Sequence, residues 1–135
     1  MRSHAITVVD LSRALDSAGR EALRRSELAV LVVRDDVRGV AAGCEVARQL
    51  ADDSSHPGIV VRQGRSRHLE PHLVAGGVGY PLLGSFVDDS ALLLAAERGD
   101  PPARSARSSL ARLCIKLLGD LSEPSVVQQK ARVEV

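Results

Sequence analysis

Asp10 is the first residue of this sequence whose type and position could do chemistry. It follows the apolar run "AITVV" at residues 5–9, which is typical of a short buried strand. An aspartate at the end of such a strand places a carboxylate at the carboxyl edge of a parallel sheet, where α/β proteins bind ligands such as Mg²⁺-nucleotides. The alternative is that Asp10 caps the turn after the strand, which the pattern alone favours.

Two other polar clusters carry weaker chemical signals. The stretch "HLEPH" offers His68, Glu70 and His72, of which two histidines four residues apart could share a metal. Pro71 lies between them and favours a helix start at that point, so we expect loop residues there and no metal. The stretch "RQGRSR" (62–67) could meet a phosphate or an acidic partner, but a solvated loop is the better interpretation.

A phosphate-binding loop is absent from the 135 residues. The motif G-x-x-x-x-G-K-[ST] needs a lysine behind a glycine-rich turn. The two lysines, Lys116 and Lys130, lie in "LCIKLL" and in the polar C-terminal stretch, and "GGVGYP" does not follow G-x-G-x-x-G. We therefore expect no ATPase activity from this chain alone. A site built from the strand-end residues Asp10, Arg34 and Arg62 is the least favoured hypothesis.

Composition restricts the class of protein. With 135 residues, 44% hydrophobic and 26% charged, the chain can form one globular domain. A net charge of +1, one Tyr, one Phe and no Trp argue against nucleic-acid binding. Cys44 and Cys114 are isolated, and the longest apolar run, "LAVLVV" (28–33), is far too short to cross a bilayer. We expect a cytoplasmic protein without a signal peptide, a transmembrane segment or a bound metal.

The elements that must position these residues alternate along the chain. We expect strands at 5–9, 28–33, 59–63 and 82–86, the second of them covered on both faces. We expect helices at 16–26, 37–50, 72–75, 88–98 and 105–121, the last with an apolar stripe formed by Ala106, Leu110, Leu113, Cys114, Leu117, Leu118 and Leu121. This order predicts an α/β fold with a mostly parallel sheet of about four strands flanked by helices. Residues 1–121 would form the domain and 122–135 a polar tail.

Two long stretches resemble one family. Residues 8–50, "VVDLSRALDSAGREALRRSELAVLVVRDDVRGVAAGCEVARQL", are similar to the switch-II strand, helix, strand and helix of MinD/ParA-type P-loop ATPases. Residues 80–118, "YPLLGSFVDDSALLLAAERGDPPARSARSSLARLCIKLL", are similar to the closing segment of the actinobacterial CpaE-like branch, the septum-site-determining proteins found beside secretion and pilus loci. The resemblance covers roughly residues 5 to 121.

The resemblance implies a partial P-loop fold that lacks the phosphate-loop strand. It implies that Asp10 is a vestigial switch-II carboxylate, which in full-length relatives reaches Mg²⁺ of bound ATP through water. It also implies a role in septum placement or polar secretion, with a partner from that machinery or a second copy, at the membrane or pole. We expect no cofactor for this chain. The alternative function is a small non-catalytic interaction module that binds a partner through its last helix or an exposed sheet edge.

Overall fold

The computed structural model describes residues 6–53, 56–66 and 69–122. Its centre is a three-stranded sheet in the order β1-β2-β3, formed by Ala29–Arg34, Pro57–Gln63 and Leu82–Val87. Both strand pairs are parallel, with Val32 opposite Val60 and Val60 opposite Gly84. The expected α/β fold with a parallel sheet is confirmed, whereas the described residues form three strands and not four.

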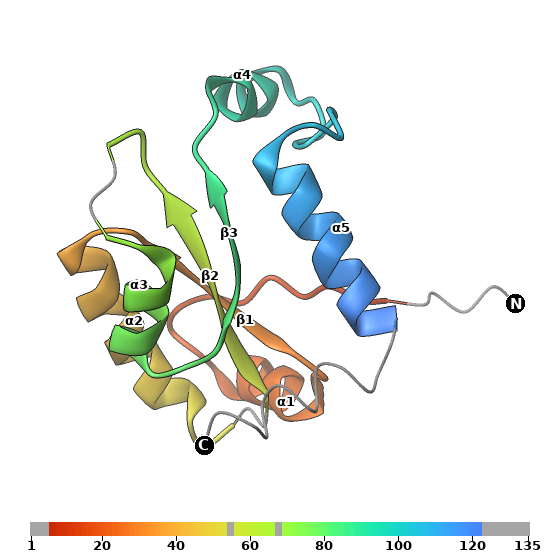
Figure 1. The fold of residues 1–135 in the computed structure, drawn as a ribbon. Coiled ribbons are helices and arrows are strands. Elements are labelled where there is room, and N and C mark those ends of the chain that lie inside the picture. Colours follow the sequence, from red (N-terminus) through yellow and green to blue (C-terminus); the bar gives the residue numbers. More distant parts are fainter. Residues whose placement is uncertain (1–5, 54–55, 67–68, 123–135) are drawn as a thin grey trace, which may run out of the picture.

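The helices surround this sheet in layers. The connecting helices α2 (Val37–Leu50) and α3 (Pro71–Val78) lie together on one side of the sheet, and α5 (Ser109–Ser122) lies on the other (Figure 1). Helix α1 (Ser17–Arg25) precedes β1, and α4 (Ser90–Arg98) follows β3. Aspartates at 16, 36 and 89 cap the amino ends of α1, α2 and α4.

The core lies between the sheet and the α2/α3 layer. Its central cluster consists of buried aliphatic residues from β1, β2 and α3, namely Val33, Ile59, Val61, Val74 and Ala75. A second cluster joins Leu23 of α1, Ala29 of β1 and Leu50 of α2, with Leu11 and Leu15 packed against it. Burial of these side chains holds α1 and α2 on the same face of the sheet.

The strand predicted at 5–9 is wrong over the residues that the structure describes. Residues 6–9 are irregular, and the side chains of Val8 and Val9 are 87% and 59% exposed. A β-strand needs a neighbour to accept and donate its ladder hydrogen bonds, and β1 pairs only with β2 here. Residues 6–9 therefore have the composition of a strand but do not form one.

The first strand of the sheet is also less covered than predicted. Ala29 and Val33 face the core and are buried, but Val30 and Val32 on the opposite face are 44% and 56% exposed. An apolar run in the sequence does not distinguish a strand covered on both faces from one whose second layer is missing. By contrast, Ile59, Val60 and Val61 of β2 are all buried, as expected for a central strand.

Two helices differ from their predicted extents. Helix α3 runs through Gly76 and Gly77 and ends at the left-handed Gly79, so the glycines expected to end it lie inside it. Helix α5 begins at Ser109, four residues later than expected. Its buried residues are Ala111 and Leu113, while the Leu118 of the predicted stripe is 47% exposed.

Candidate functional site

Asp10 lies in the irregular segment before α1 and is exposed. It lines an open cavity of about 310 Å³ whose walls come entirely from residues between Val9 and Ala22. Arg34 and Arg62 therefore do not join Asp10 there. The turn and cap bonds nearby are accepted by Ser12 and Asp16, and Asp10 makes no hydrogen bond with any described residue.

The carboxyl edge of the sheet holds a different aspartate. Asp35 follows β1 and is 1% exposed, and its Oδ1 accepts a hydrogen bond from the backbone N–H of Gly64 at 3.1 Å. Its Oδ2 is buried and has no hydrogen-bond partner among the described residues. Asp35 thus ties the end of β1 to the chain leaving β2, at the edge where α/β sheets bind ligands.

The arginines at this edge are each paired with a neighbouring acid. Arg34 lies 3.4 Å from the carboxylate of Asp36, which also caps α2 through the N–H of Gly39 at 2.6 Å. Arg62 donates through Nε to Asp88 at 2.7 Å, and this hydrogen bond raises the pKa of Arg62. Because each guanidinium already faces a carboxylate, these two arginines do not form a free phosphate cradle.

The "HLEPH" stretch does not form a cluster in the described part. His68 lies outside the described residues, Glu70 precedes α3 without a side-chain cap bond, and His72 is exposed in the first turn of that helix. Among residues 6–53, 56–66 and 69–122, no group of three His, Cys, Asp or Glu side chains is placed to hold a metal ion.

The free edge of β3 is covered by side chains of α5. The N–H of Asp88 bonds the Gln63 carbonyl of β2, so the backbone groups of the preceding residue, Val87, point away from β2. The Ser109 hydroxyl accepts from the Val87 N–H at 3.0 Å and donates to the Val87 carbonyl at 3.3 Å. Lys116 Nζ donates to the Leu83 carbonyl at 2.9 Å. A strand from another chain would have to displace these bonds.

No described residue covers the free edge of β1 in this way. The N–H groups of Ala29 and Asp35 bond carbonyls of the β2 segment, so the backbone groups of Val30 and Val32 point to the opposite, outer side. Within the described ranges nothing hydrogen-bonds those outer groups. With the exposed side chains of Val30 and Val32, β1 offers an apolar strand edge that is open to pairing. We call Val30, Val32 and their outer backbone groups the β1 edge.

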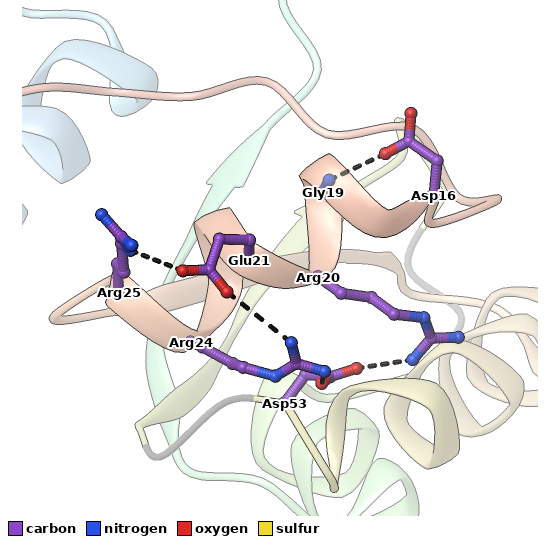
Figure 2. Close-up of polar contacts among 7 residues, drawn as sticks. All are labelled: Asp16, Gly19, Arg20, Glu21, Arg24, Arg25 and Asp53. Atoms are coloured by element: carbon purple, nitrogen blue, oxygen red, sulfur yellow. Dashed lines mark hydrogen bonds and ion pairs between the residues drawn. The ribbon is translucent and has the colours of Figure 1, made fainter.

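An ion-pair cluster fixes α1 to the chain at the end of α2. Asp53, after α2, is 4% exposed and accepts from Arg20 at 2.5 Å and from Arg24 at 2.8 Å, both in α1 (Figure 2). The hydrogen bond from Arg20 is the largest cause of the lowered pKa of Asp53. The same view shows Asp16 closing the amino end of α1 at Gly19, at 2.7 Å.

The comparisons with known proteins give no relative: no family model, no curated protein and no solved structure matches the chain. None of the helices in the described part is long and apolar enough to cross a membrane.

Sequence reasoning missed the residues that distinguish the two sheet edges. Ser109 and Lys116 occur in an ordinary helical pattern, and nothing local shows that their side chains reach Leu83 and Val87. Asp35 is one of two adjacent aspartates, and only the fold shows which is buried and which caps α2. The sequence predicts an exposed sheet edge but does not indicate which edge of the sheet it is.

Proposed function

We propose that this chain is a MinD/CpaE-like protein of septum placement or polar secretion and pilus assembly that does not hydrolyse ATP by itself. It acts by binding a protein partner from that machinery through the β1 edge. The observation that carries the proposal is the contrast between the two edges of one sheet. The β3 edge is hydrogen-bonded by Ser109 and Lys116, while the β1 edge is apolar and unpaired among the described residues.

The β1 edge fits a strand-adding mode of recognition. An extended peptide that joins the sheet there would satisfy the outer N–H and C=O groups of Val30 and Val32. Its apolar side chains would cover the faces of these two valines, which are 44% and 56% exposed. The resemblance supports this interpretation, because MinD/ParA-type proteins place a phosphate-loop strand within the sheet and these 135 residues contain no such loop.

A nucleotide role for this chain alone has little support in its residues. Neither lysine stands in a phosphate loop, and Arg34 and Arg62 are each paired with an aspartate. Asp10 remains the residue that the resemblance assigns to Mg²⁺ in full-length relatives. Titration of the purified chain with Mg-ATP by calorimetry should give no saturable heat. A dissociation constant in the micromolar range would overturn the proposal.

The alternative function is a small non-catalytic interaction module without this ancestry. The exposed Ile115 (61%) and Leu118 (47%) of α5 favour it, because they offer apolar side chains on the last helix. Two variants locate the binding surface: Val32→Lys tests the β1 edge, which either function can use, and Leu118→Lys tests α5, which only the alternative uses. Leu73→Lys, at a residue of α3 that is 67% exposed, is the matched control for both.

A further inference from the structure

The residues just before the α1 region have the composition of a strand but lie unpaired. Ile6, Thr7, Val8 and Val9 are all β-branched, the class that most favours strands. In the structure they are irregular, and Val8 is 87% exposed. We call Ile6–Val9 the N-terminal strap. Val8 and Val9, which are 87% and 59% exposed, would gain apolar burial by entering a sheet at a cost in chain entropy.

The position of α1 suits a strand on the free side of β1. Leu23 of α1 shares a buried cluster with Ala29 of β1 and Leu50 of α2, so α1 and α2 cover the same face. Successive parallel strands are joined by right-handed crossovers, whose helices lie on one face when the strands follow in order. Helix α1 precedes β1 as α2 precedes β2, so a strand before α1 reaches the free side of β1 by a crossover on the same face.

The segment between the strap and α1 is loosely packed. The cavity of about 310 Å³ lies here, and its walls include Val9, Leu11 and Leu15 before the helix and Gly19 and Ala22 within it. Leu11 and Leu15 pack against the cluster of Leu23, Ala29 and Leu50, and the exposed residues before Leu11 can move while these two side chains stay in place. While that chain moves, the ion pairs of Asp53 with Arg20 and Arg24 hold α1 in place.

We propose that the N-terminal strap closes onto the β1 edge as an added parallel strand and so competes with the partner for that edge. The arrangement in the structure is the open one. The competition rests on the function proposed above, whereas the closure is a property of the chain alone. Attachment through α1 gives the strap an effective concentration in the millimolar range or higher, which favours it over the strap of a second copy.

Hydrogen exchange of the Val30 and Val32 amides, followed by NMR on the purified chain, tests the closure. The double variant Thr7→Pro/Val8→Pro removes two adjacent N–H groups, one of which must face β1. The control Thr7→Val/Val8→Thr keeps both β-branched side chains. We expect both amides to exchange roughly tenfold or more slowly in the wild type and the control than in the proline variant, because closure hydrogen-bonds them.

Two results would overturn the closure. One is equal exchange of the Val30 and Val32 amides in the wild type and the proline variant. The other is protection that increases with protein concentration, which would assign the β1 edge to a second copy. These measurements contain no partner, so their failure leaves the proposed function to its own test. If the closure and the proposed function are both correct, the proline variant binds the partner more tightly than the wild type does.

Discussion

At the scale of single residues, Asp53 is the group on which the position of α1 depends. Its carboxylate is nearly enclosed and receives two arginines from one helix, across 33 residues of sequence in the case of Arg20. From the sequence alone, Arg24 is a basic residue near the carboxyl end of its helix, with no sign of its distant partner. A contact over that separation cannot be inferred from local spacing, because it depends on how α1 and α2 share a face.

Asp53→Asn should lower stability at neutral pH and change its dependence on acid. The pKa of Asp53 lies below its ordinary value of 3.8 in the folded protein. Its stabilising contribution is therefore complete above that value and is lost as the pH falls through the lower folded pKa. Urea unfolding between pH 3 and 7 should show a wild-type advantage at pH 6–7 that shrinks below about pH 4.

The matched control for this variant is Glu45→Gln. Glu45 forms an exposed pair with Arg48 within one helix, so its loss should change the free energy of unfolding by less than about 1 kcal/mol. If the wild type and Asp53→Asn kept a constant difference down to pH 3, the carboxylate would not be acting through its charge.

Two helical glycines should respond oppositely to alanine. A Cβ at Gly39 would lie 2.5 Å from the backbone oxygen of Arg34, whereas one at Gly76 would meet nothing within 4 Å. Gly39→Ala should destabilise by about 1–3 kcal/mol despite the better helix former. Gly76→Ala should stabilise by about 0.5–1 kcal/mol. Thermal unfolding of both variants checks this, and a stabilised Gly39→Ala would show that α2 is not held against β1 as described.

At the scale of elements, side chains of α5 cover the β3 edge of the sheet, whereas no described element covers the β1 edge. The sequence predicted β1, β2, β3 and α4 to within about two residues, because their apolar runs and caps decide them locally. It failed for residues 6–9, where the pattern is that of a strand but the neighbour that would complete it is missing from the described sheet. The predicted apolar stripe of α5 is only partly right: Leu113 is buried, whereas Cys114 and Leu118 are exposed and Lys116 bonds the β3 edge.

Removal of the β3 edge cover should make the chain associate with itself. Ser109→Ala/Lys116→Met frees the outer backbone groups of Val87 and Leu83 for pairing with another strand. We expect the apparent mass in size-exclusion chromatography with light scattering to increase with concentration. The control Ser122→Ala/Arg112→Met changes the same kinds of side chain on α5, and neither original residue bonds β3. Equal masses for the two double variants would contradict the covering role.

At the scale of the whole molecule, the two edges of the sheet differ. The β3 edge is hydrogen-bonded by side chains of α5, and the β1 edge is unpaired among the described residues. The core between the sheet and the α2/α3 layer is closed by Ile59, Val61 and Val74, each fully or almost fully buried. The opposite layer contains α5 over β3 and leaves the Val30 and Val32 side of β1 exposed. This asymmetry supports the proposal that another strand completes the sheet at the β1 edge.

Site-specific photocrosslinking in the native host tests this account most directly. A photoreactive residue replaces Val32 at the β1 edge or, as the matched control, Leu73 on α3, which is 67% exposed. We predict a discrete crosslink from position 32 to a component of the division or secretion machinery, and none from position 73. The same crosslink from both positions, or no discrete product from position 32, would contradict binding through the β1 edge.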